Sequence, residues 1–122
     1  MPLRPSLTTT AQPLLVLTTL PDAATADSIA SRLIDDGCAA CVAVGAPVRS
    51  LYHWQGKTET ATEIPLSIKT TAEAYPAVER IVHSMHPYDL PEIIAVPITA
   101  GLAPYLDWIA ASCNRSKAPA DV

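Results

Sequence analysis

Two long strand-like segments in the middle of the chain most limit how it can fold. Residues 40–55 are rich in Val, Leu, Tyr and Trp, and Gly and Pro at positions 45–47 predict a kink or bulge there. Residues 56–62 read as a polar turn. Apolar residues then occupy every second position, at Ile64, Leu66 and Ile68. This spacing predicts a strand with one buried face, next to the first in a long hairpin.

Helical periodicity appears before this hairpin. Residues 14–19 form a short apolar run, which predicts a first strand buried on both faces. Asp22 then suits a helix N-cap, and Gly37 suits the left-handed position that closes a helix. Between them, apolar residues recur at helical spacing: Ala26, Ile29, Ala30 and Leu33.

A second helix is predicted after the hairpin, over about residues 74–85. Pro76 is tolerated only in its first turn, and His86-Pro87 should end it, because the residue before a proline leaves the α region. Residues 92–98 predict a last strand. A third helix follows, with Pro104 in its first turn.

The predicted order is therefore βαββαβ plus a C-terminal helix. It fits an α+β, ferredoxin-like sandwich with one antiparallel sheet and helices on one face. We expect a single domain over residues 14–112, with loose tails at 1–13 and 113–122. The long middle strands would extend past so small a body, and exposed strand edges favour pairing with another copy of the chain.

Composition supports a partner and excludes some classes of protein. Only 16% of the 122 residues are charged, against roughly 25% in an average protein, so part of the surface is expected to be covered. The net charge of −4, with scattered basic residues, argues against nucleic acid or an anionic membrane as partner. No apolar run reaches the length of a membrane span, and no secretory pattern precedes the domain. We therefore expect a cytoplasmic protein with reduced thiols.

Cys38-Ala-Ala-Cys41 has the spacing of a redox motif, but in the wrong context. Such a motif opens a helix, where the dipole lowers the pKa of the first thiol, whereas this pair follows a helix end and enters a strand. A structural zinc site would need four ligands, and no second pair exists. Two buried or half-buried thiols are the favoured interpretation.

His83 and His86, three residues apart near a helix end, leave two interpretations open. The spacing places both rings on one helix face, yet helix C-termini favour histidine for electrostatic reasons alone. A copper or nickel site shared between subunits stays possible. No hydrolase elbow, P-loop, dinucleotide fingerprint or zinc-protease motif is present.

Two residue strings resemble the CutA divalent-ion tolerance family. One is Tyr52-His-Trp54-Gln-Gly-Lys57 with Lys69 in the following strand, and the other is His86-Pro-Tyr88-Asp-Leu-Pro-Glu92. The resemblance runs from about Leu15 to Ser112. It implies a ferredoxin-like fold, a cytoplasmic homotrimer and an association with tolerance to copper and other divalent ions. The family's trimer looks like that of the PII signalling proteins, which implies small-ligand sensing by fold analogy.

The resemblance also implies a ligand cleft between subunits. Its residues would be Tyr52, Trp54, Lys57, Lys69, His86, Tyr88 and Glu92. The lysines would hold an anionic or metal-chelated ligand against the aromatic rings, while His86 and Cys41 are the candidate metal ligands. No cofactor is obligatory, and Cu(II) is the candidate metal. Alternatively, Trp54 and Tyr88 are interface core, and a Glu63–Lys69 type of pair holds strands together.

Three functions remain after these observations. The first is a trimeric binding or sensing protein linked to divalent-metal tolerance, with no catalysis of its own. The second is an enzyme acting on a small metabolite in the cleft, which would need a group with a tuned pKa. The third is a stable trimeric scaffold for another protein.

Overall fold

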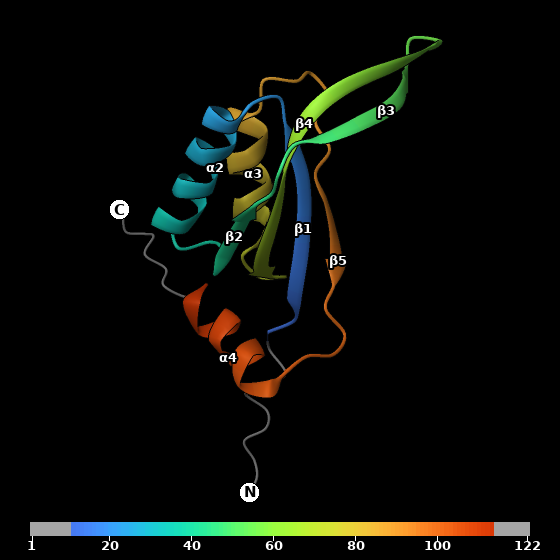
Figure 1. Ribbon diagram of the computed structural model, residues 1–122. Helices are drawn as coiled ribbons and strands as arrows, with labels where there is room; N and C mark the ends of the chain where they lie inside the picture. The colour runs from blue at the N-terminus through green and yellow to red at the C-terminus, as the bar shows by residue number, and fades with distance from the viewer. Residues whose placement is uncertain (1–10, 114–122) are drawn as a thin grey trace, which may run out of the picture.

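The computed structural model describes residues 11–113, which form one antiparallel sheet and three helices (Figure 1). The elements in chain order are β1 (Pro13–Leu20), α2 (Ala23–Asp35), β2 (Cys41–Val44), β3 (Val48–Trp54), β4 (Lys57–Thr71), α3 (Tyr75–Met85), β5 (Ile94–Pro97) and α4 (Ala103–Ser112). No helix among these residues is both long and apolar enough to span a membrane.

The sheet is built around β4. The strand order is β2-β4-β1-β5, every pairing is antiparallel, and β3 pairs with β4 alone. Helices α2 and α3 lie side by side on one face, and α4 lies at the far end of the sheet (Figure 1). The predicted mixed α+β fold with an antiparallel sheet is confirmed.

The core fills the space between the sheet and helices α2 and α3. It follows the predicted alternation: Val16, Leu20, Leu66 and Ile68 from the strands meet Ile29, Leu33, Val78 and Val82 from the helices, all fully buried. The prediction that β1 is buried on both faces is wrong. Leu15 and Leu17 point to the opposite face and are only half-buried, because no described helix packs over them.

The predicted break in the long second strand separates β2 from β3. Val44 pairs with Leu66 and Val48 with Glu63, so four steps along this strand match three along β4. The extra residue is a bulge. The carbonyl of Pro65 accepts a hydrogen bond from the Gly45 N–H at 2.9 Å. The proline nitrogen faces the same side, so its missing N–H falls where the ladder is already interrupted.

The predicted polar turn at residues 56–62 is wrong. The turn is only Gln55-Gly56, with φ of 52° and 79°, and residues 57–62 are strand paired with β3. Positive φ at both central residues is typical of a type I′ hairpin turn. Residues 57–62 are largely exposed in the single chain, and all of them except Ala61 are polar. This is why the sequence reads as a loop there.

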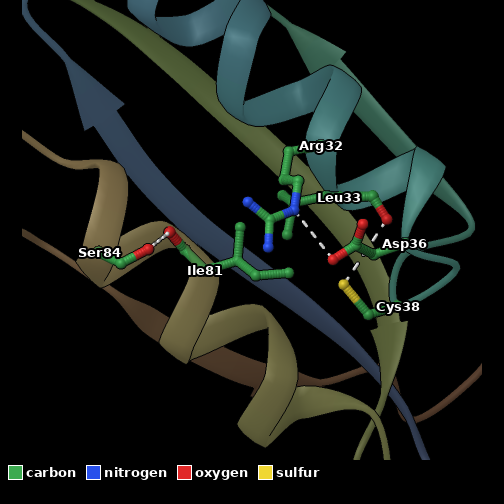
Figure 2. Close-up of polar contacts among 6 residues, drawn as sticks. All are labelled: Arg32, Leu33, Asp36, Cys38, Ile81 and Ser84. Carbon is green, nitrogen blue, oxygen red and sulfur yellow. Dashed lines mark hydrogen bonds and ion pairs between the residues drawn. The ribbon is translucent and has the colours of Figure 1, made fainter. Parts of the chain in front are cut away.

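The helix ends follow the predicted chemistry. The Asp22 carboxylate accepts a hydrogen bond from the Thr25 N–H at 2.8 Å, and Gly37 has φ of 74° just past α2. Near that end, Arg32 pairs with Asp36 at 2.9 Å (Figure 2). Pro76 lies in the first turn of α3, and His86 ends the helix with an extended backbone.

The boundaries of the domain differ slightly from prediction. Most of the two predicted tails, 1–13 and 113–122, lies outside the described residues. Gln12 and Pro13, however, belong to the fold: the Gln12 carbonyl accepts a hydrogen bond from Ala72 N–H and that of Pro13 from Ile98 N–H. The last strand, predicted over residues 92–98, is the shorter Ile94–Pro97.

The bulge gives a test of the packing between Gly45 and Pro65. A Cβ atom on Gly45 would lie 2.8 Å from Pro65 Cγ. We predict that Gly45→Ala lowers the free energy of unfolding by about 1–3 kcal/mol through this overlap. Pro65→Ala removes Cγ, so the double variant should lose less than the two single losses combined, as measured by urea unfolding. Additive losses would contradict this cause.

Candidate functional site

A groove of about 540 Å³ lies at the base of the β3–β4 hairpin. Its walls come from the end of β1, from β3, from the base of the hairpin on β4, and from the segment between α3 and β5. The lining residues are Thr19, Ser50, Leu51, Tyr52, His53, Trp54, Glu63, Tyr88, Asp89, Leu90 and Glu92. Its volume is in the range of small-molecule sites.

Glu63 is the buried charge of this groove. It sits on β4 at the last pair of the hairpin, opposite Val48, and only 7% of its surface is exposed. Its Oε2 accepts a hydrogen bond from the Tyr88 hydroxyl at 2.8 Å. Arg32–Asp36 is the one ion pair among the described residues. Glu63 therefore forms no ion pair with any of them. Buried polar groups are ordinarily hydrogen-bonded, and the Tyr88 hydroxyl is the donor to Glu63 among the described residues.

His86 fixes the segment that carries Tyr88. Its Nε2 lies 2.7 Å from the Thr19 carbonyl, and its Nδ1 accepts a hydrogen bond from the Tyr88 N–H at 3.2 Å. Because Nδ1 is an acceptor, the proton of the neutral ring is on Nε2, which donates to Thr19. The ring also packs on Tyr88, with 4.8 Å between centroids. His86 therefore positions Tyr88 against Glu63.

The hydroxyl of Tyr88 is held in its neutral form. Burial, the hydrogen bond to Glu63, the Glu63 charge and the nearby Tyr52 raise its pKa from the ordinary 10 to about 12. The neutral phenol is the hydrogen-bond donor that Glu63 Oε2 accepts from, so the contact with Glu63 favours the protonated form of Tyr88.

Four of the seven predicted cleft residues line the groove: Tyr52, Trp54, Tyr88 and Glu92. His86 is not a lining residue, but it contacts two lining residues, Thr19 and Tyr88. Lys57 pairs with Trp54 at the hairpin tip, whereas Lys69 pairs with Cys41 and Leu15 in the main sheet. Lys69 is six residues from Glu63 on one strand, about 20 Å away. Within one chain the pair Glu63–Lys69 therefore does not form, and the two lysines do not line the groove.

The two candidate metal ligands, His86 and Cys41, lie apart within one chain. Cys41 is opposite Lys69, and the residue that His86 contacts, Thr19, is opposite Pro65. Pro65 and Lys69 are four residues apart on β4, which separates the two candidate ligands by about 13 Å along the strand. Both ring nitrogens of His86 already have protein partners. Across residues 11–113, no three His, Cys, Asp or Glu side chains are grouped to hold a metal ion.

Cys38 is a structural thiol. It is buried at the end of α2 and donates a hydrogen bond to the Leu33 carbonyl, with 3.6 Å between sulfur and oxygen (Figure 2). Burial and the charge of Asp36 raise its pKa to about 11. A thiol so far from ionisation is a poor nucleophile at neutral pH. This agrees with the interpretation of Cys38 and Cys41 as buried and half-buried thiols.

The electrostatic character of the groove was not foreseen. Three carboxylates, Glu63, Asp89 and Glu92, line it, and neither lysine nor arginine is among its described lining residues. The sequence suggested Lys69 as a partner of Glu63. It gave no signal for the observed partner, Tyr88, which is 25 residues further on. The groove is suited to a positively charged ligand.

The chain is similar to known proteins over nearly all of its described length. The family model described as CutA1 divalent ion tolerance protein matches residues 14–112. The Divalent-cation tolerance protein CutA of Thermus thermophilus is 41% identical over 95 residues, which are 78% of this chain and 92% of that protein.

Solved structures agree with these sequence matches. CutA1 from the psychrotrophic bacterium Shewanella sp. SIB1 has a TM-score of 0.82 and 44% identity, covering 84% of this chain and 96% of that one. The periplasmic divalent cation tolerance protein CutA from Archaeoglobus fulgidus has a TM-score of 0.79 and 39% identity, covering 83% and 98%.

The pairing of Tyr88 with Glu63 predicts a pH dependence. The folded pKa of Tyr88 lies above its unfolded value, so its contribution to stability is complete below pH 10 and declines as pH rises towards 12. We expect Tyr88→Phe to remove this decline. It should also cost about 1–3 kcal/mol near neutral pH, because it leaves Glu63 without its donor.

Urea unfolding at a series of pH values measures both effects. Tyr105→Phe on α4 is the control, because the Tyr105 hydroxyl forms no hydrogen bond within the described residues. Equal effects of the two substitutions would show that the Tyr88 hydroxyl does not stabilise Glu63.

Proposed function

The chain belongs to the CutA1 divalent ion tolerance family, and we propose that it works as a homotrimer that binds a metal ion or a small ligand between its subunits. We place it in the cytoplasm and take Cu(II) as the candidate metal, as the family resemblance implies. The role is binding in support of divalent-cation tolerance rather than catalysis.

The topology supports a ferredoxin-like fold for this function. The order of elements is βαββαβ with the second strand divided into β2 and β3, followed by α4. The strand order β2-β4-β1-β5, with α2 and α3 on one face, matches that arrangement.

An open apolar sheet face supports the trimer. Leu15 pairs with Val96 and Leu17 with Ile94, so these four side chains share the face opposite α2 and α3. Ile94 is 50% exposed in the single chain. The hairpin adds exposed Leu51, Tyr52 and Trp54. Exposed apolar side chains gathered in this way mark an interaction site, and the low charge content of the chain is consistent with that.

The observation that carries ligand binding is the buried Glu63 in the groove. Glu63 is almost fully buried, and among residues 11–113 it forms no ion pair. It is therefore the groove residue best placed to accept a hydrogen bond from a positively charged ligand. The exposed hairpin that forms one wall would bring a neighbouring subunit to the rim of the groove.

Two features favour binding over catalysis. Tyr88, the groove residue whose pKa is clearly shifted, is held protonated and is therefore neither a base nor a nucleophile at neutral pH. Cys38, the buried thiol, is outside the groove and also held protonated. Neither group offers the activated state that turnover would need.

A copper site in this assembly would draw ligands from more than one subunit. Within residues 11–113 of one chain no suitable group of three ligands exists. Cys41 lies on the open sheet face, in the row of Lys69 and Leu15, so the proposed interface is where its thiol would meet a second chain. Soft thiol and imidazole ligands suit copper.

Assembly is tested by a matched pair of substitutions. Ile94, 50% exposed, lies on the open sheet face, and Ile34, 44% exposed, lies on helix α2. We predict that Ile94→Lys dissociates the trimer in dilute solution, because it places a charge inside the interface, while Ile34→Lys does not. Light scattering gives the masses. A monomeric unmodified chain, or two variants with the same mass, would contradict the proposed interface.

Copper binding is tested on the same proteins. If ligands come from several subunits, the trimer should bind Cu(II) at least about tenfold more tightly than the Ile94→Lys monomer. Cys41→Ser should weaken binding by the trimer. His86→Ala should mainly lower stability, because the ring holds the Tyr88 segment. Calorimetric titration measures affinity, and equal affinity in trimer and monomer would rule out a shared site.

A further inference from the structure

The groove combines three features that together define one kind of ligand. It has a buried carboxylate, Glu63, at its base and aromatic side chains from two separate segments, Tyr52 and Trp54 on β3 and Tyr88 after α3. It also lacks lysine and arginine among its described lining residues.

One oxygen of Glu63 is left for the ligand. Oε2 accepts the hydrogen bond from Tyr88, whereas Oε1 has no hydrogen-bond donor among the described residues. Within residues 11–113, Thr18 Oγ1 is the one side-chain polar atom that is both fully buried and without a hydrogen bond. Oε1 has no hydrogen bond either, so it is not fully buried. Glu63 is itself 7% exposed and lines the groove, so Oε1 is accessible from there.

A bare metal ion is poorly matched to this arrangement. Hard divalent cations such as Mg²⁺ and Ca²⁺ take about six or more oxygen ligands, some of them from water. The other two carboxylates, Asp89 and Glu92, are on the exposed rim and do not group with Glu63 into a ligand set. Aromatic rings supply no ligands to such an ion.

An organic ammonium is well matched. Aromatic faces attract cations within about 6 Å of their centroids, and a carboxylate gives a charge-assisted hydrogen bond to an N–H donor. The exposed Asp89 and Glu92 add negative potential at the entrance. An anion, which the sequence also allowed, would meet only repulsion from the carboxylates of this chain.

We propose that the groove is a binding site for a primary alkylammonium group, with Glu63 Oε1 accepting its hydrogen bond and Tyr52, Trp54 and Tyr88 enclosing its alkyl chain. This inference rests on the proposed use of the groove as a ligand site. It does not depend on the copper site. It does require that a neighbouring subunit leave the groove open, because Tyr52 and Trp54 also belong to the exposed hairpin surface.

Matched probes of one chain length test the charge of the ligand. The probes are n-butylammonium, n-butanol and butyrate, added to the full protein in its natural assembly. Trp54 lines the groove and Trp108 lies on α4, so Trp108→Phe leaves Trp54 as the single indole reporter. We expect a saturable change in Trp54 fluorescence with n-butylammonium, at least tenfold weaker binding of n-butanol, and no binding of butyrate.

Matched variants test the residue. Glu63→Gln keeps the shape and an acceptor for Tyr88 but removes the charge, and should weaken n-butylammonium binding about tenfold or more. Glu73→Gln is the control, because Glu73 is exposed, follows the opposite end of β4 and is not among the groove residues. It should leave the affinity unchanged. Circular dichroism and mass confirm that both variants fold and assemble.

Three outcomes would overturn the proposal. The first is no saturable response to n-butylammonium, as expected if a neighbouring subunit fills the groove. The second is equal affinity in the Glu63→Gln and unmodified proteins. The third is tighter binding of butyrate than of n-butylammonium. Loss of copper binding or of the trimer in the separate experiments leaves this test intact, because the probe reports on the groove alone.

Discussion

The pairing of β4 with three other strands is the constraint on which the groove and the hairpin depend. Its second half lies between β1 and β2 in the covered sheet, and its first half pairs with β3 alone and extends beyond the body. At the junction, Ile64 is buried against the helices, and the next residue towards the tip, Glu63, faces the groove. The two-residue periodicity of a strand thus places a charge directly beside the core.

The segment after α3 makes this junction a site. Pro87 forces the chain out of the helix at His86, and both ring nitrogens of His86 then fix the new direction, one on Thr19 and one on the Tyr88 backbone. Tyr88 can therefore reach Glu63. The His-Pro-Tyr string, which carries much of the family resemblance, has a physical explanation in this chain: it positions a neutral phenol against a buried carboxylate.

The composition of the chain fits the open side of the sheet. A low content of charged residues leaves apolar side chains from β1 and β5 on a face that no described helix covers. The same face carries Lys69, which the sequence analysis predicted as a cleft residue, and Cys41, which it predicted as a metal ligand. Strand register assigns them to the sheet instead. Their role thus depends on what packs on that face, whereas the contact between Glu63 and Tyr88 forms within one chain.

The sequence alone determined the order of elements, the helix caps at Asp22 and Gly37, the bulge near Gly45 and the end of α3 at His86, because these follow from local backbone chemistry and short-range periodicity. It missed residues 57–62 as strand, since exposed pairs in a hairpin need no apolar pattern. Only the tertiary structure shows which residues come together in the groove and which do not. Glu63 meets Tyr88 across 25 residues, and strand register separates Lys69 and Cys41 from them. Contacts between distant segments have no local signal in sequence.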